Sequence, residues 1–582
     1  MTAATTSRRL LIGVVIAAAA LVGGRALSAI YADYSWYNAH GANALWNERA
    51  GDSLLVYGIG FTLGVVIAFV NLAALGRSIG VLTLPRRLAN VEFGEAVPRR
   101  YIDRFAFVLA LAIASALTPA LPRWTALALA KLNVSFRESD PYFQHDLAFY
   151  TTWLPFEKAV YAWAMLLSVT VSVLVVLLYS LTPGLRWERA GLRMSAHVRR
   201  HLSVLAALLL LITMWSYRLQ SYDLLVHGSG EEGVFSYVDH QWLLPGLVLL
   251  SIATAAAAIT VLLSGWTGQL RTSFIAVTVV VVLAIMVQEV IPVLVRRFTS
   301  NDAQMVRERP YIATRADYNR RAYGSNSGLY DTLRKSGVAA ALDSVVTSAA
   351  GRQLMRQDSL VYPGARGLVV ISDPQLDVAG QRVGDGLPRL GLAWAYQSFE
   401  LLSDSVPRRA RLVAVRDLRT RVRELVPVFA QGTVVEPMFH ADTLYWKLEL
   451  YSASDDYPLS RHFVLAGDDR SYFRHAATAL VNARTARVMI APDPMLDPIA
   501  QVWMTAFPNA SDYRAPGVAR ELTTTPWEPV NTEGQGVLED STFRASVTRL
   551  YNRMRAALAA SDLKAFGMAY DSLGALIGPA RR

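Results

Sequence analysis

The sequence predicts a membrane protein: a seven-helix transmembrane α-bundle followed by an α+β extracytoplasmic domain with a C-terminal helical hairpin. Three observations support this fold class. The 582 residues are 53% hydrophobic and only 18% charged, which is less charge than a soluble protein of this size usually carries. Apolar runs long enough for a spanning helix of about 20 residues recur until 273–298. Beyond them, shorter strand-like and helix-like patterns alternate.

Seven apolar segments are candidate transmembrane helices. The first follows Arg8 and Arg9 and is rich in alanine, as in a signal peptide. Its length and the six segments after it favour an uncleaved anchor instead. The segments lie at 10–31, 53–75, 104–121, 155–181, 201–220, 241–264 and 273–296.

Basic residues are distributed unevenly among the loops between these segments. Arginines gather after the second, fourth and sixth: Arg77, Arg86, Arg87, Arg99, Arg100, Arg186, Arg189, Arg193, Arg199, Arg200 and Arg271. Because cytoplasmic loops carry the excess of Lys and Arg, we expect a multi-pass protein of the cell (inner) membrane. Its N-terminus would be cytoplasmic, and the chain after Arg297 would be extracytoplasmic.

The overall charge excludes some classes of protein. The net charge is +11, yet residues 298–582 hold 34 Lys and Arg against 30 Asp and Glu. The excess therefore lies mostly in short loops, which is typical of membrane topology rather than of a nucleic-acid-binding face. The chain has no cysteine, which excludes disulfides, thiolate metal sites and a cysteine nucleophile.

Composition divides the chain into four parts. A transmembrane domain at 1–298 includes two structured outer loops, at 122–153 and 221–240, which are acidic and aromatic. The α+β domain follows at 299–508, a linker rich in Pro, Thr, Gly and Asn at 509–540, and the helical hairpin at 541–582.

The pattern after the last span predicts individual elements. Charged, amphipathic stretches indicate helices at 301–324 and 327–350, and helical spacing recurs at 390–402 and 495–507. β-Branched and aromatic runs indicate strands at 364–373, 410–417, 443–451 and 461–467, and a hairpin at 477–491 that turns near 483–486.

Several stretches, in order, resemble one known family. They include Asp140-Pro141 with Leu154-Pro155-Phe156, and the segments 308–324, 416–429, 444–460, 493–508 and 556–576. The chain is similar to uncharacterised protein family 0182, multi-pass bacterial membrane proteins with a large extracytoplasmic domain. The resemblance implies the same seven-span layout and no established activity. Between Gly324 and Arg389 the chain is shorter than the resemblance implies.

Four polar residues within the apolar segments form a candidate membrane-embedded polar site: Glu289, Gln288, Arg25 and Asn71. A charge at membrane depth is costly and often functional, for instance in a proton or cation relay. This favours a transporter or channel that uses Glu289. Alternatively, Glu289 reaches the outer interface or Arg296 and Arg297, Arg25 pairs locally, and Asn71 bridges helices.

Acidic residues of the outer loops form a candidate cation-binding rim: Asp140, Asp146, Asp223, Glu231, Glu232 and Asp239, accompanied by His145, His227 and His240. Carboxylate oxygens gathered on one face could hold a calcium ion. No EF-hand spacing is present, so a solvated or arginine-paired rim is the favoured interpretation, and no resident metal or cofactor is expected.

Enzyme motifs are scarce. Residues 228–233 match GxGxxG, but no strand precedes them and two glutamates would repel a phosphate, so we interpret them as a loop. The acidic pairs at 455–456 and 468–469 suit turns, and Asp493-Pro494 and Asp497-Pro498 suit a turn and a helix N-cap with proline at the first helical position. With no HExxH, GxSxG or P-loop, we expect no catalytic residues, although paired carboxylates would suit a membrane-anchored envelope hydrolase.

The sequence therefore predicts an integral membrane protein that displays an extracytoplasmic interaction or scaffold domain. This domain would bind a partner protein, a lipid or an envelope component. The transporter or channel and the envelope hydrolase are the alternatives. The expected partners are the lipid bilayer and either a partner membrane protein or a second copy of the chain, with no nucleic acid.

Overall fold

The computed structural model describes residues 2–79, 99–182, 184–188, 191–230, 233–298, 301–323, 359–440, 443–493 and 496–508, with Arg549, Asn552 and Arg553. Contacts divide the chain into two compact units, Met1–Thr524 and Thr525–Arg582. The predicted linker at 509–540, almost all of the hairpin at 541–582 and the helix expected at 327–350 lie outside the described residues.

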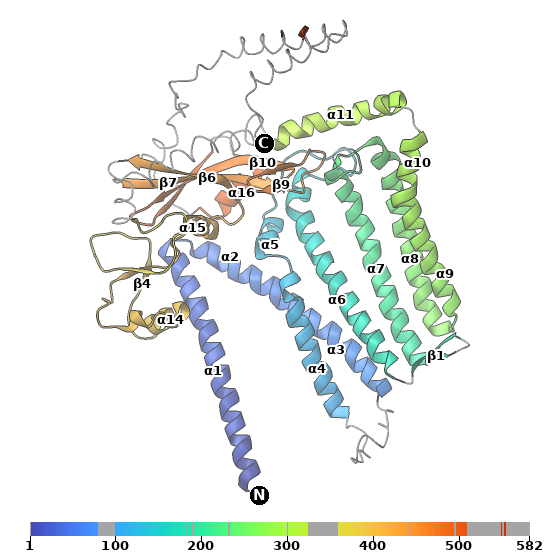
Figure 1. The fold of residues 1–582 in the computed structure, drawn as a ribbon, viewed down its shortest axis with the longest axis horizontal. Coiled ribbons are helices and arrows are strands. Elements are labelled where there is room, and N and C mark those ends of the chain that lie inside the picture. Colours follow the sequence, from blue (N-terminus) through green and yellow to red (C-terminus); the bar gives the residue numbers. More distant parts are fainter. Residues whose placement is uncertain are drawn as a thin grey trace. The chain divides into compact units, whose positions relative to one another are not determined.

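Seven helices are long and apolar enough to cross a membrane, and each overlaps one predicted segment (Figure 1). They are Gly13–Ala39, Asn43–Gly76, Arg100–Ala120, Phe149–Ser180, Ala196–Val226, Asp239–Thr267 and Leu270–Phe298. They indicate a multi-pass membrane protein. They extend beyond the apolar runs because helical geometry continues into flanking polar residues.

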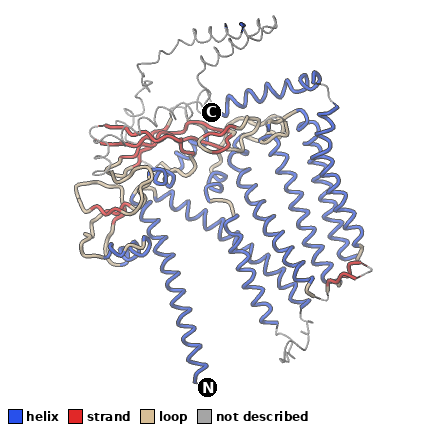
Figure 2. The backbone as a smooth tube through the Cα atoms, in the orientation of Figure 1, coloured by secondary structure: helices blue, strands red, loops and turns tan. Residues whose placement is uncertain are grey.

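The helical elements of this half, drawn blue in Figure 2, are α1 (Thr2–Ala39), α2 (Asn43–Ser53), η1 (Leu54–Gly58), α3 (Ile59–Ile79), α4 (Arg99–Leu117), η2 (Thr118–Ala120), α5 (Trp124–Lys131), η3 (Phe149–Trp153), α6 (Leu154–Ser180), α7 (Ala196–Val226), η5 (Asp239–Leu243), α8 (Leu244–Thr267), α9 (Leu270–Ile285), η6 (Met286–Val290) and α10 (Ile291–Phe298). A short hairpin that the sequence did not predict, β1 (Leu185–Glu188) with β2 (Gly191–Met194), joins α6 to α7. Helices α3 to α9 pack side by side, whereas α1 packs along α2, α14 and β4.

Three of the spans widen to a π-helical turn just before a proline. The turns η3, η5 and η6 end two residues before Pro155, Pro245 and Pro292. Proline lacks a backbone N–H and clashes with the carbonyl four residues earlier, and that carbonyl lies inside each π turn. The prolines therefore explain the widened turns, which insert an extra residue at the end of each span nearest the sheets.

The region after the last span contains strands, as predicted. Helix α11 (Asn301–Tyr323) comes first, followed by β3 (Val369–Ile371), β4 (Gln381–Arg382), α14 (Leu387–Tyr396), η7 (Phe399–Leu402), β5 (Arg411–Val413), α15 (Leu418–Leu425), β6 (Ala430–His440), β7 (Thr443–Ser454), β8 (Phe463–Leu465), β9 (Asp468–Arg470), β10 (Tyr472–Asn482), β11 (Val488–Pro492) and α16 (Pro498–Ala506). The sequence analysis did not identify α15 or β6.

The largest sheet has the order β11-β10-β7-β6, with every pair antiparallel. A smaller sheet has the order β3-β5-β4, and β8 pairs with β9. Pro437 lies in β6, at the edge of the sheet, where a missing N–H donor is tolerated. The hairpin β10–β11 turns at Asn482 to Arg487, as predicted.

One face of the large sheet forms the main hydrophobic core. Alternate residues of β7, Leu444, Trp446, Leu448 and Leu450, pack with α15 and α16. The same cluster includes Trp36 and Tyr37 from the end of α1 and Leu45 from α2. The first membrane helix therefore contributes to the core of the sheet region.

The opposite face of this sheet holds a charged cluster around His475. Its Nδ1 lies 2.5 Å from Asp493 Oδ2 and its Nε2 lies 2.8 Å from Glu449 Oε2. Lys447 Nζ lies 3.3 Å from the other oxygen of Glu449. Burial alone would lower the pKa of His475, but the two carboxylates outweigh it and raise the pKa to about 9.

We predict a pH-dependent loss of stability from this cluster. Because the folded pKa exceeds the unfolded value, the contribution is full below a pH of about 6.5 and disappears as the pH rises through about 9. The melting temperature should fall across this range when tryptophan fluorescence reports unfolding. His475→Gln should flatten that dependence, and an unchanged slope in this variant would contradict the assignment.

Candidate functional site

The end of α1 is joined to α15 by a buried arginine. Arg421 is 0% exposed. It donates to the carbonyls of Val415, Ala379 (2.7 Å) and Ala486 (2.9 Å), and its Nη2 lies 2.8 Å from His40 Nε2. Every partner is an acceptor without formal charge, so hydrogen bonds rather than a carboxylate stabilise the guanidinium.

Burial determines the charge states of this pair. It lowers the pKa of Arg421 to about 9 and, helped by the neighbouring guanidinium, lowers the pKa of His40 to about 3. His40 is therefore neutral at physiological pH. Its Nδ1 donates to Trp36 O at 2.7 Å, which leaves Nε2 as the acceptor for Arg421.

A second set of contacts flanks this pair. Glu424 of α15 accepts from Tyr37 Oη at 2.9 Å and from Arg49 Nη1 at 2.7 Å. Arg49 also lies 2.6 Å from Tyr37 Oη. We call this group, with Arg421 and His40, the α1 seam. It connects the first two membrane helices to the sheet region.

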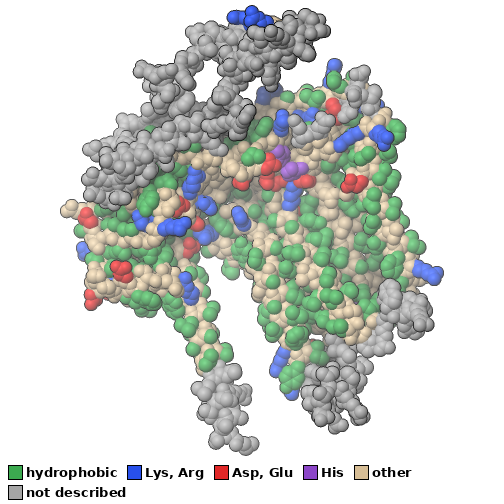
Figure 3. All heavy atoms as spheres, viewed as in Figure 1, with side chains coloured by type: hydrophobic (Ala, Val, Ile, Leu, Met, Phe, Trp, Pro, Cys, Tyr) green, Lys and Arg blue, Asp and Glu red, His purple; other side chains and the backbone are tan. Residues whose placement is uncertain are grey.

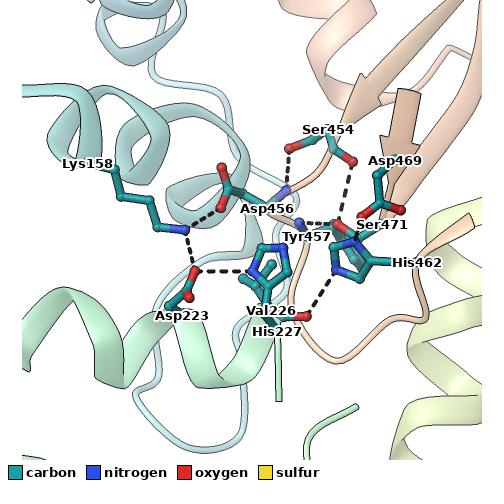
Figure 4. A network of polar contacts seen from close by, with 10 residues as sticks. All are labelled: Lys158, Asp223, Val226, His227, Ser454, Asp456, Tyr457, His462, Asp469 and Ser471. Atoms are coloured by element: carbon teal, nitrogen blue, oxygen red, sulfur yellow. Dashed lines mark hydrogen bonds and ion pairs between the residues drawn. The ribbon is translucent and has the colours of Figure 1, made fainter. Parts of the chain in front are cut away.

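A separate ion-pair network joins α6 and α7 to the loop after β7 (Figure 4). Lys158 Nζ lies 2.5 Å from Asp223 Oδ1 and 2.6 Å from Asp456 Oδ1. Asp456 is almost fully buried, and its N–H donates to Ser454 Oγ at 3.1 Å. We call this group, with the two histidines described next, the lysine seam.

Two histidines extend the lysine seam. His227 Nδ1 lies 3.2 Å from Asp223 Oδ1, and the hydrogen bond to that carboxylate raises the pKa of His227. The His227 ring packs 4.5 Å, centroid to centroid, from the ring of His462. His462 contacts Asp469 Oδ2 at 3.0 Å and donates from Nε2 to Val226 O at 3.1 Å. Figure 3 shows acidic, basic and histidine side chains gathered where the helices meet the sheets.

Main-chain and aromatic contacts reinforce this side. The N–H of Leu459 donates to Leu225 O at 2.7 Å. The outer loops, α11 and the sheet share a second hydrophobic core that includes Tyr150, Tyr222, Phe235, Tyr311, Tyr457 and Tyr472. Helix α11 contributes further bonds, from His240 to Tyr311 Oη (2.8 Å) and from Arg315 to Phe235 O (2.9 Å).

Two acids of the predicted rim, Asp140 and Asp146, accept hydrogen bonds from the outer loop that carries them. Asp140, fully buried, accepts from the N–H groups of Tyr142, Phe143 and His145. Asp146 accepts from Ser135 Oγ and two N–H groups, and these bonds lower its pKa against the effect of burial.

The remaining rim residues have different surroundings. Asp239, also fully buried, accepts from the N–H and hydroxyl groups of Ser229 and Ser236, and Asp223 belongs to the lysine seam. Glu231 and Glu232 lie outside the described residues. Within the described ranges, no group of three or more His, Asp or Glu residues could hold a metal ion.

The four polar residues predicted for a membrane site do not converge. Arg25 donates to Trp394 O at 2.5 Å and Ala395 O at 2.6 Å. Asn71 Oδ1 lies 2.9 Å from His201 Nε2, whose other nitrogen is 2.8 Å from Tyr179 Oη. This second group bridges α3, α7 and α6.

The two polar residues of the last span, Gln288 and Glu289, also have different surroundings. Gln288 donates to Gln220 Oε1 at 3.2 Å, which links η6 to α7. Glu289, the next residue, is exposed on the surface of the span. Three of the four polar residues therefore serve packing between elements, and the arrangement gives no shared polar path for an ion.

The acidic residues considered for hydrolysis have structural partners. Asp497 caps α16 through the N–H of Ile499 and accepts from Ser452 Oγ (2.7 Å) and Tyr472 Oη (3.1 Å). Asp468 pairs with Arg470 at 2.6 Å. The cap agrees with the predicted helix N-cap, whereas Asp468 lies in strand β9 rather than in the predicted turn.

The sequence analysis did not single out Lys158 or Arg421, the residues that connect the two halves. Lys158 follows Glu157 inside a predicted apolar span, and a charged pair at that position was an available signal. Glu157 itself is buried and accepts from the indoles of Trp153 and Trp215. Arg421 gave no comparable signal, because it stands among other arginines in an amphipathic helix.

Comparison with known proteins places these features in a family. The sequence matches the Uncharacterised protein family (UPF0182) over residues 10–342 and 377–514. The chain belongs to this family. The matched ranges include all seven candidate spans and both seams, and the gap between them falls within the segment that the sequence analysis expected to be shorter.

Similar proteins named UPF0182 protein occur in several bacteria. The relative in Desulforamulus reducens is 34% identical over 192 residues, which cover 32% of this chain and 20% of the relative. The relative in Moorella thermoacetica is 28% identical over 312 residues (50% and 33%), and that in Saccharopolyspora erythraea is 29% identical over 331 residues (55% and 33%). The chain thus aligns with a fifth to a third of these relatives' length. No solved structure matches the chain.

We predict that Lys158→Met loosens the lysine seam, because the substitution removes the ammonium group that lies between Asp223 and the buried Asp456. Backbone amides of residues 456–460 should exchange hydrogen about tenfold faster, which corresponds to about 1.4 kcal/mol of local stability. Hydrogen-exchange mass spectrometry measures this change.

Lys131→Met provides the matched control. Lys131 also bridges two carboxylates, Glu48 and Asp52, but all three lie in the helical half. The control should leave exchange at 456–460 unchanged, and Lys158→Arg should restore it. Equal acceleration in both methionine variants would contradict a specific role for the lysine seam.

Proposed function

We propose that this protein is an integral membrane protein of the cell membrane that displays an extracytoplasmic interaction or scaffold domain. In this proposal the seven spans anchor the chain, the N-terminus is cytoplasmic, and the region from 299 to 508 binds a partner protein, a lipid or an envelope component. In the same proposal, residues 509–540 form a linker and residues 541–582 form a helical hairpin. The role is one of binding rather than catalysis.

The observation that carries this proposal is the double attachment of the sheet region. Buried Arg421 connects it to the first span, and Lys158 connects it to α6 and α7. A domain held by two separate seams has a defined orientation on its helices, as a scaffold requires. A transporter function has less support, because Arg25, Asn71 and Gln288 contact three separate sets of partners.

Charge supports the proposed orientation. At the end of the spans remote from the large sheet, the described residues include Arg100, Arg199, Arg200 and Arg271, and Arg199 donates to Gly265 O at 3.0 Å. Cytoplasmic loops carry an excess of such residues. In this proposal the sheet region that follows the last span lies on the opposite side of the membrane.

We predict opposite labelling of two single-cysteine variants, which the cysteine-free chain makes possible. Val464→Cys lies on β8 at a position 78% exposed, and Ala196→Cys lies at the exposed start of α7. A membrane-impermeant maleimide should label Val464→Cys in intact cells and Ala196→Cys only after permeabilisation. The reverse pattern would overturn the orientation.

We further predict that a photo-crosslinking amino acid at position 464 captures a constituent of the envelope in living cells. The same group at position 196 should not give that product. Mass spectrometry of the adducts distinguishes a protein, a lipid, a glycan and a second copy of this chain. If position 464 gives no adduct beyond the background of position 196, the interaction role fails for this face of the domain.

A further inference from the structure

A small lobe of the sheet region is attached along the first membrane helix. It consists of the sheet β3-β5-β4 with α14 and η7, and we call it the α14 lobe. Its own core includes Val383, Leu392, Leu401 and Leu412, together with Ala32 of α1. Figure 1 shows α14 lying beside α1, below the large sheet.

The contact between α14 and α1 is close and specific. A Cβ atom on Gly24 would lie 2.5 Å from the indole of Trp394, and one on Gly391 would lie 3.2 Å from the ring of Tyr31. Two glycines thus allow the helices to approach. Gln381 of β4, fully buried, adds a bond to Ala32 O at 2.6 Å.

The position of Arg25 within the first candidate span indicates how deep in a bilayer this contact would lie. It lies 14 positions before the end of the candidate span Gly13–Ala39, which is about 21 Å at 1.5 Å per residue. A bilayer needs about 20 residues of helix, and every stretch of that length within Gly13–Ala39 contains Arg25. Because Arg25 bonds the carbonyls of Trp394 and Ala395, a bilayer around this candidate span would place the last turn of α14 at membrane depth.

Several backbone carbonyls at the ends of α14 and η7 have partners inside the protein. The last carbonyls of a helix normally lack partners, but Arg25 donates to Trp394 O and Ala395 O, and the N–H groups of Gln397 and Ser398 donate to Trp394 O and Ala393 O. Arg389 donates to two carbonyls at the end of η7 and just after it, Leu401 O and Ser403 O, both at 2.5 Å. Irregular backbone facing lipid needs such internal partners.

The outward side chains of α14 and η7 are mostly apolar, with the charged Glu400 among them. Leu387 is 82% exposed, Phe399 is 74% exposed, and Leu390 and Leu402 are also exposed. They continue the exposed apolar surface of α1, where Val22 is 71% exposed. Glu400, next to Phe399, is exposed as well, as expected where acyl chains meet headgroups.

We propose that α14 and η7 form an interfacial membrane element that inserts Leu387, Leu390, Phe399 and Leu402 among lipid acyl chains. The leaflet is the one on the side of the sheets, whichever side of the cell that is, so the inference does not depend on the proposed orientation. The domain then contacts the bilayer itself, in addition to the spans that precede it.

Single spin labels in the full-length protein test this inference. Leu387 and Val464 are both apolar and similarly exposed, so labels at Leu387→Cys and Val464→Cys can be compared directly. Val22→Cys places a label on the first candidate span. In vesicles of phosphatidylcholine and phosphatidylglycerol, oxygen collides more often with labels in lipid, and a water-soluble nickel chelate collides with labels in water. Power saturation of the electron paramagnetic resonance signal measures both.

We expect the label at Leu387 to behave like that at Val22, with a ratio of oxygen to nickel accessibility several-fold above that at Val464. Phe399→Cys repeats the measurement if the first variant fails to fold. High nickel accessibility at Leu387 would show that the lobe is in water. Low accessibility to both reagents would show that protein covers it. Either result overturns the inference, whereas the topology labelling tests the proposed function separately.

Discussion

The buried guanidinium of Arg421 is the contact on which the remaining architecture depends. It stabilises carbonyls from three different segments and the end of α1 at once. Removing it would leave those buried acceptors unpaired, at a cost of about 1–3 kcal/mol for each such group. The sheet region and the first span are therefore cooperative parts of one unit rather than a domain on a tether, and the ion pairs of Lys158 reinforce that unit from the other side.

Periodicity was sufficient to predict the membrane half. Long apolar runs can be satisfied in lipid only as helices, so each of the seven predicted segments coincides with a helix. The main strands were also visible, since TLYWKLELY alternates between two faces of a sheet. Strand β6 was not identified, because AQGTVVEPMFH contains glycine and proline, and the small hairpin β1–β2 carries no strong strand signal. The predicted C-terminal hairpin lies outside the described residues.

Neighbouring residues in the sequence predicted the helix-cap role of an acid better than they predicted which distant residue an acid would contact. Asp497 before Pro498 indicated a helix N-cap from neighbouring residues alone. No local pattern could show that Asp456 would meet Lys158, 298 positions earlier. The outer-loop acids were selected for their charge, whereas Asp140 and Asp239 are used to fold their own loops. Which acids remain available to a ligand depends on tertiary contacts that spacing does not encode.

The separation in sequence between His40 and Arg421 also has a consequence for biogenesis. These two side chains are 381 positions apart, so the ribosome delivers the partner of the first span only after all seven spans have been made. Until then α1 lacks its contacts with α14 and β4, and Arg25 lacks the carbonyls that later accept its hydrogen bonds. The contacts of the first span are thus formed late in biogenesis, because they require residues that follow the seventh span in the sequence.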